Sequence, residues 1–210
     1  ETEQETIIAT RNARVVTTQV NQSSSGVRVE SEAQFQNRMD PLSQSFDVQG
    51  DSVNDEGRFI TSVDLFFSDK DDTLPVIVEI RNMSDGYPGP KVLPFGRKVL
   101  APSEVNTSST GATATTVTFD SPIFVKAGFE YCITLLSHSQ EYKVWISRMG
   151  ETDIGGTRTI SEQPHIGVLF KSSNNTTWAP SFLEDLKFSL KTAKFTAGAT
   201  GTVTLQNETL

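Results

Sequence analysis

The sequence predicts an all-β fold, an antiparallel β-sandwich of jelly-roll-like form with extended linking segments at both ends. Three observations predict it. Short stretches alternate apolar and polar residues, Gly, Pro, Asp and Asn clusters separate these stretches, and no window keeps the 3.6-residue period of a helix. A period of two in short strands is typical of antiparallel sheets that bury one face. The 210 residues suffice for one such domain with extensions.

The first segment, residues 1–38, is polar and rich in Gln, Ser, Thr and Asn. Within it, residues 14–20 and 27–29 are β-prone, and the turn-forming stretch 21–26 lies between them. We expect this segment to form a hairpin, or an extended arm that leads in from a preceding module.

The central segment, residues 39–190, carries the sandwich pattern. Val63, Leu65 and Phe67 share one face of residues 59–68, and Ser62, Asp64 and Ser68 lie on the other, which predicts a strand with one buried face. The same period recurs in residues 76–81, 129–135 and 186–190. Short helical turns are expected only at residues 102–105 and 181–185. We expect the strands to pack face to face over a core of Val, Ile, Leu and Phe.

The last segment, residues 191–210, has few apolar residues. Residues 195–201 lead into a predicted strand at 202–205 that has no evident partner within the central segment. We therefore expect a linker and the start of a following module. The sequence begins with Glu1 instead of Met, and we interpret the chain as a piece of a longer protein.

Composition and charge argue against two classes of partner. The formal net charge is −8, and no run of Lys or Arg is present, whereas nucleic-acid binding requires clustered cations that replace phosphate counterions. No apolar run approaches the ~20 residues of a membrane helix. We expect neither nucleic-acid binding nor membrane insertion. The single cysteine, Cys132, lies in the apolar stretch 129–136, and we interpret it as a small core residue.

The sequence contains no pattern typical of an enzyme. The two histidines are His138 and His165. Ser137 and Ser139 flank His138, but neighbouring strand residues point to opposite faces and make poor partners in a catalytic triad. Neither a Gly-x-Ser-x-Gly elbow nor a glycine-rich phosphate loop occurs. We expect no catalytic residues and no organic cofactor.

One acidic loop is a candidate metal site. Asp69, Asp71 and Asp72 follow the strand that ends at Phe67, and clustered carboxylates can bind Ca²⁺ through oxygen ligands. The loop lacks the Gly and the distal Glu of an EF-hand, and Lys70 interrupts it. A solvated turn between strands is the alternative interpretation.

Aromatic residues suggest a binding surface. In residues 142–147, Tyr142, Val144 and Ile146 fit the core, which sends Trp145 to the opposite face. Trp178 ends a polar loop that contains Asn174 and Asn175. Exposed aromatic rings beside amide side chains can stack on sugars, and they can equally anchor one protein module against another. Both interpretations remain open from the sequence.

The central segment also resembles a known family. Residues 40–48, DPLSQSFDV, resemble the DPLAQSF opening that recurs in large virion structural proteins of tailed marine and T4-like phages, with Ser43 in place of Ala. The resemblance extends over about residues 39–195. Its further segments follow in the same order as in the phage modules: residues 59–67, 74–81, 86–89, 144–150, 159–164 and 183–188.

This resemblance implies a jelly-roll-like module, similar in shape to carbohydrate-binding modules, within a tail fibre or baseplate protein of the virion. It implies assembly in the host cytoplasm with other virion proteins or with modules of the same parent chain. A homo-oligomer, trimeric as in many fibres, and contact with a host surface glycan are further expectations from the family. It supplies no catalytic residues.

Overall fold

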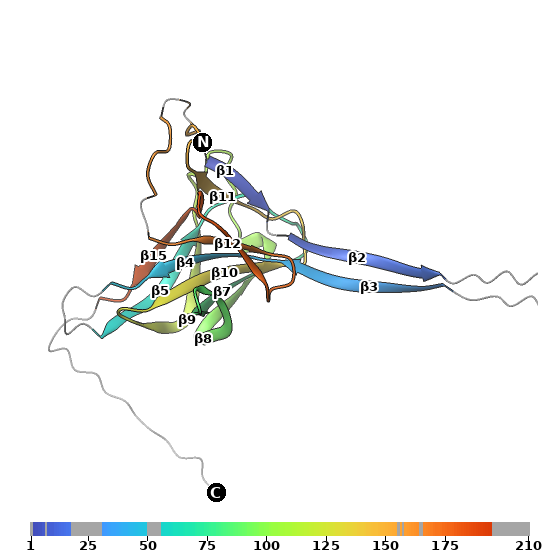
Figure 1. The fold of residues 1–210 in the computed structure, drawn as a ribbon, viewed down its shortest axis with the longest axis horizontal. Helices are drawn as coiled ribbons and strands as arrows, with labels where there is room; N and C mark the ends of the chain where they lie inside the picture. Colours follow the sequence, from blue (N-terminus) through green and yellow to red (C-terminus); the bar gives the residue numbers. More distant parts are fainter. Residues whose placement is uncertain are drawn as a thin grey trace, which may run out of the picture.

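The computed structural model describes residues 2–6, 8–17, 31–49, 56–154, 156, 158–163 and 166–194. For the residues before 41 it describes the backbone alone. The described chain is built of antiparallel sheets that pack against one another, which confirms the predicted all-β sandwich (Figure 1). Within the described residues the one helical element is a 3-10 turn, η1 (Pro102–Glu104), at a predicted position. The helical turn predicted at 181–185 is wrong, because these residues join two strands.

The strands are short and follow one another closely. Their bounds are β1 Thr2–Thr6, β2 Ile8–Thr17, β3 Ser31–Asp40, β4 Leu42–Asp47, β5 Gly57–Leu65, β6 Phe67–Asp69, β7 Val76–Ser84, β8 Tyr87–Leu100, β9 Thr115–Lys126, β10 Glu130–Ser137, β11 Lys143–Arg148, β12 Leu169–Ser172, β13 Trp178–Ser181, β14 Glu184–Leu186 and β15 Phe188–Thr192. Among the described residues they form four sheets. These are a six-stranded sheet in the order β13-β12-β4-β10-β7-β8, a three-stranded sheet β15-β5-β9, a sheet β1-β11-β14 in which β6 also pairs with β11, and the two-stranded sheet β2-β3.

The core lies between these sheets and follows the predicted alternation. On β9, Val117, Phe119, Ile123 and Val125 are buried, and the residues between them are exposed or half-buried. β10 departs from the pattern, since every residue from Cys132 to Ser137 is buried. This strand lies inside the six-stranded sheet and both its faces are covered. Cys132 is fully buried, as predicted, and burial raises the pKa of its thiol.

Two predicted strands are each divided where the chain passes from one sheet to another. Residues 59–68 become β5 in the three-stranded sheet and β6 beside β11, with Phe66 between them. Residues 186–190 divide in the same way at Lys187, between β14 and β15. The two crossing points meet, because the Lys187 ammonium lies 4.6 Å from the centre of the Phe66 ring. Such sheet-switching corners close a sandwich at its edge.

The N-terminal segment forms a ribbon and also contributes a strand to the body. β2 pairs with β3 in an antiparallel register from Ile8–Asp40 to Thr17–Ser31. The predicted turn at 21–26 and the predicted strand at 27–29 lie outside the described residues. The ribbon projects away from the sandwich (Figure 1). Ahead of it, β1 pairs along β11. The strand predicted at 202–205 lies outside the described residues.

Candidate functional site

Trp145 is buried, and the prediction that it lies on an exposed face is wrong. Its side chain is 5% exposed although Val144 and Ile146 do face the core as predicted. The loop after η1 covers the indole: Ser108 N donates to Phe67 O at 2.9 Å, and Trp145 Nε1 donates to Ser108 O at 2.9 Å. A Cβ at Gly111 would lie 3.1 Å from the indole, so the ring packs directly on this glycine.

Trp178 is buried as well, at 7% exposure on β13. It belongs to the six-stranded sheet, whereas Trp145 belongs to the sheet around β11. The two tryptophans therefore pack within the fold at separate sheets, and they do not form the exposed aromatic surface that the sequence suggested.

The two asparagines ahead of Trp178 organise their own loop. Asn174 Oδ1 accepts from Thr176 N at 2.9 Å and from Thr177 N at 2.7 Å, which closes a turn. Asn175 has a φ of 58°, in the left-handed region that asparagine tolerates. Its Oδ1 accepts from Arg81 Nη1 at 2.9 Å.

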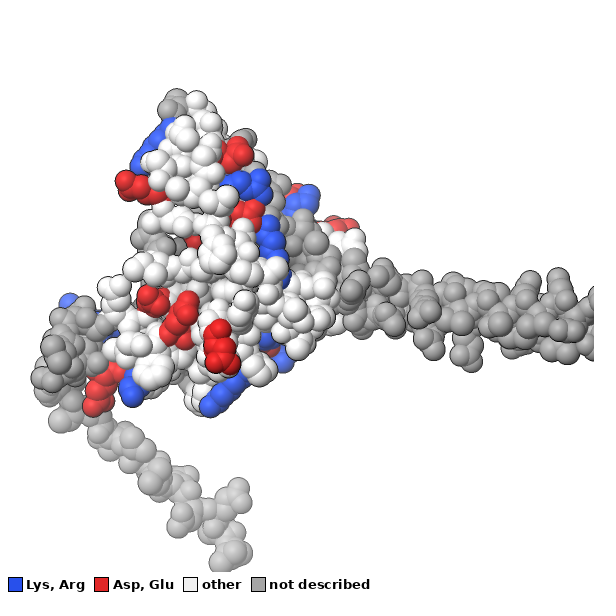
Figure 2. Space-filling model, in the orientation of Figure 1, with Lys and Arg blue, Asp and Glu red and all other residues white. Residues whose placement is uncertain are grey.

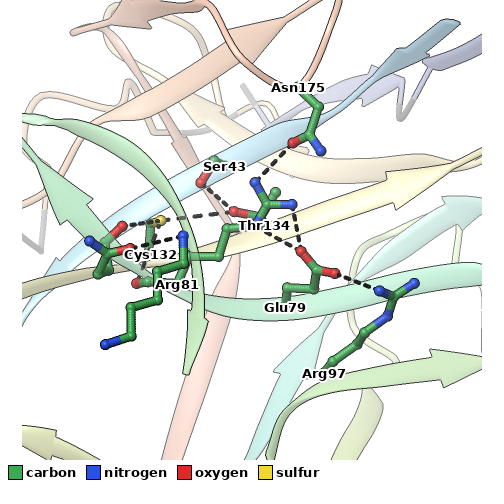
Figure 3. A network of polar contacts seen from close by, with 9 residues as sticks. Ser43, Glu79, Arg81, Arg97, Cys132, Thr134 and Asn175 are labelled. Carbon is green, nitrogen blue, oxygen red and sulfur yellow. Dashed lines mark hydrogen bonds and ion pairs between the residues drawn. The ribbon is translucent and has the colours of Figure 1, made fainter. Parts of the chain in front are cut away.

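Arg81 is the centre of a buried polar network on the outer face of the six-stranded sheet (Figure 3). Its Nε donates to Glu79 Oε2 at 2.7 Å, and Arg97 lies 3.5 Å from the other carboxylate oxygen. Glu79 and Arg81 are 4% and 5% exposed. Glu79 pairs with both arginines, and Arg81 also binds Asn175, so the network fastens the Asn175 loop to the sheet.

The three carboxylates of the acidic loop do not converge on one point. Among the described residues, no group of three or more His, Cys, Asp or Glu side chains gathers where a metal ion could bind. Asp71 is turned inward, where its Oδ1 accepts from Thr73 N at 2.6 Å and Leu74 N at 2.8 Å. Hydrogen bonds from Ser139 and from this backbone lower the pKa of Asp71. Asp69 instead pairs with Lys143 at 3.6 Å, and Asp72 is exposed on the turn.

The histidines do not assemble a triad in the described chain. His138 is exposed, while the hydroxyls beside it have structural roles. Ser137 Oγ donates to Pro75 O at 3.0 Å, and Ser139 Oγ accepts from Glu141 N at 3.0 Å. His165 lies outside the described residues.

A second polar cluster connects four strands around Glu184 on β14. Lys171 Nζ and Ser181 Oγ each lie 2.7 Å from Glu184 Oε2, and Arg148 Nε donates to Oε1 at 2.9 Å. Burial alone would raise the pKa of Glu184, but the hydrogen bonds from Lys171, Ser181 and Arg148 outweigh it and lower the pKa to about 2. The cluster holds β11, β12, β13 and β14 together around the Glu184 carboxylate.

Two surface features were not found from the sequence. A groove of about 600 Å³ lies between the ends of β4 and β15, lined by Phe46, Asp47, Gln49, Ile166, Phe188, Ser189 and Leu190. On the outer face of the three-stranded sheet, Phe59 and Phe124 are paired across β5 and β9 with ring centres 5.1 Å apart. Each feature joins residues from separate strands, so no local motif could indicate it.

The charged residues do not gather by sign on the face that Figure 2 displays. Red and blue side chains lie interspersed there among uncharged ones. No helix among the described residues is long and apolar enough to cross a membrane. No family model matches the chain, and neither a curated protein nor a solved structure matches it.

Proposed function

We propose that the chain is a structural module of a phage tail fibre or baseplate protein, where it connects neighbouring modules or subunits of the virion. The observation that carries the proposal is the β2–β3 ribbon, which leaves the sandwich body as an arm (Figure 1). A two-stranded ribbon is at best marginally stable alone in water. Such an arm gains stability from a surface supplied by an assembly partner.

The internal use of the polar groups supports the same proposal. The charged clusters around Arg81 and Glu184 connect loops and strands of the body to one another. Both tryptophans serve packing. The body is thus built as a tightly connected unit from which the arm extends, as a mechanical connector requires.

Immunogold electron microscopy tests this proposal. Antibodies raised against the purified chain are applied to tailed phage particles from the source of the sequence. We expect label confined to the tail or baseplate of intact particles. Protein detected in the lysate but absent from purified particles would overturn the proposal.

A glycan-binding role is the second candidate, and the Phe59–Phe124 pair favours it. Phe124 is 47% exposed, and an exposed ring can stack on the apolar face of a sugar. Glycan-array binding that falls at least ten-fold in Phe124→Ala would support this role. Phe182→Ala is the matched control, because Phe182 is also exposed, at 70%, but lies in the β13–β14 turn. Absence of binding to host envelope polysaccharides would exclude it.

A further inference from the structure

The three-stranded sheet ends at β15, and the edge of this strand borders a groove. Among the described strands β15 pairs with β5 alone, which makes it an edge strand of its sheet. Its side chains alternate, since Leu190 packs partly buried against the core while Ser189 and Lys191 are exposed. The backbone N–H and C=O groups along such an edge are a template to which another strand can add.

The backbone of β15 directs every second residue toward β5. Ala193 N and Lys191 O both form hydrogen bonds with residues of β5, at 2.8 and 3.1 Å. In an antiparallel ladder the N–H and C=O groups of one residue point to the same side, and those of the next residue point to the other. The backbone groups of Leu190 and Thr192 therefore point away from β5, toward the open edge.

Two adjoining hollows follow this edge along the length of β15. The larger, the groove of about 600 Å³, is lined by Phe188, Ser189 and Leu190. Successive side chains of a strand point to opposite faces, so a hollow that contacts all three residues reaches the backbone edge between them. A second hollow of about 170 Å³ contacts Leu190 and Thr192. The opposite wall of both hollows is formed by Phe46, Asp47 and Gln49.

The groove offers both apolar and polar surroundings. Ile60 and Val125 of the core line the smaller hollow, and Ile166, which is 73% exposed, lines the larger one. Asp47 and Gln49 are exposed. A strand laid along β15 would place one face over the core and the other in solvent, so the strand that fits has alternating apolar and polar residues.

We propose that residues 202–205 of the same chain add to β15 as a fourth strand of this sheet and fill the groove. Their sequence, Thr-Val-Thr-Leu, alternates polar and apolar residues and is rich in the β-branched residues that favour strands. Residues 194–201 lead from the end of the β15 pairing to this segment and contain Gly198 and Gly201. Closing so short a loop costs less entropy than recruiting a strand from another molecule, which also loses its freedom to move separately.

One antiparallel register suits both faces of the added strand. With Val203 opposite Leu190, the second apolar residue of the segment, Leu205, also lies on the face that covers the core. Thr204 then lies opposite Ser189 on the solvent face. A shift by one residue would turn both apolar side chains to solvent. The strand expected at 202–205 thus gains a partner within the central segment, and this inference does not depend on the proposed virion role.

Disulfide formation in the full chain tests both the partner and the register. The backbone groups of Ser189 point toward β5, so Ser189 and Thr204 would form a pair without mutual hydrogen bonds, with Cα atoms ~4.5 Å apart, which a disulfide can span. The test protein carries Ser189→Cys with Thr204→Cys. The matched control carries Ser189→Cys with Val203→Cys, whose second thiol would lie on the opposite face. The native thiol, Cys132, is fully buried and does not compete.

We expect mild oxidation to close an intramolecular disulfide in the test protein at least ten-fold faster than in the control, at a rate independent of protein concentration. Intact mass and mobility without reductant distinguish this product from a linked dimer. Tryptophan emission verifies that both proteins are folded, because Trp145 and Trp178 are buried. Equal rates in the two proteins, or no intramolecular bond in either, would overturn the docking of residues 202–205. Dimers in place of the intramolecular product would also overturn it and assign the groove to the segment of another copy.

Discussion

Replacing Glu184 with Gln should weaken the sandwich in a way that depends on pH. Glu184 is 5% exposed. One oxygen of its carboxylate accepts hydrogen bonds from Lys171 and Ser181, and the other accepts one from Arg148. An amide of the same shape keeps the packing. It offers one neutral acceptor in place of two charged ones, and it removes the Glu184 carboxylate from Lys171 and Arg148.

The pKa of Glu184 sets the magnitude. A pKa of about 2 in the folded chain against the usual 4.5 corresponds to at most about 3.4 kcal/mol, at about 1.36 kcal/mol for each pH unit. The Arg148 and Lys171 side chains are 36% and 38% exposed, and water screens part of the attraction. We therefore expect the charged cluster to contribute about 1–2 kcal/mol.

The sign follows from the direction of the change. Because folding lowers the pKa of Glu184, the stabilisation is complete above pH 4.5 and is lost as the pH falls toward 2. Urea unfolding of the wild type and Glu184→Gln at pH 7 should differ by about 1–2 kcal/mol. At about pH 2.5 the difference should shrink to less than half of that value.

A pH-independent difference between the two proteins would refute the electrostatic reasoning and indicate a packing defect. Other carboxylates also titrate in this range, but they do so in both proteins and cancel in the comparison. Glu162→Gln serves as the control, since Glu162 is exposed and its replacement should change stability by less than about 0.5 kcal/mol at either pH.

Three further predictions concern residues that the structure places in tight surroundings. Gly111→Ala should destabilise the fold by about 1–3 kcal/mol and shift tryptophan emission, because its φ is +65° and its Cβ would lie 3.1 Å from Trp145; unchanged emission and unfolding midpoint would contradict that packing. Asp71→Ala should lower the free energy of unfolding by about 1–3 kcal/mol, because the Thr73 and Leu74 amides lose their acceptor, and a calcium titration of the wild type should leave the melting temperature unchanged. The Cys132 thiol should resist Ellman's reagent in the native protein and react fully in denaturant, since it is buried and its pKa is raised; rapid native reaction would show that β10 is accessible.

The period of two predicted the fold because apolar and polar residues alternate within each single strand. The buried residues of β9 and the fully buried Val76, Val78 and Ile80 of β7 follow a period of two. The breaks at Phe66 and Lys187 could not be predicted this way. At each break the backbone forms a hydrogen bond with Trp145, which is distant in the sequence. Trp145 N donates to Phe66 O, and Lys187 N donates to Trp145 O, both at 2.9 Å.

The exposure of Trp145 and the convergence of the three aspartates were predicted wrongly for the same reason. Alternation correctly places Trp145 on the face opposite Val144, but it cannot show that a loop more than thirty residues away in the sequence covers that face. The clustering of Asp69, Asp71 and Asp72 is equally local. Whether their carboxylates converge depends on Lys143 and Ser139, which approach from elsewhere in the chain. The local sequence therefore does not predict the contacts that these side chains form with residues distant in the chain.

The attachment of the ribbon to the body fits the proposed role as a connector. β3 continues into β4 with only Pro41 between them, and β4 is paired on both sides, with β10 and β12. The other strand of the ribbon, β2, follows β1, which is paired with β11 in a different sheet. A pull along the arm is thus transmitted along paired strands, so that the hydrogen bonds of each ladder share it and must shear together instead of opening one by one. With both strands of the ribbon anchored in separate sheets, the arm can be ordered by a partner without first unfolding the body from which it extends.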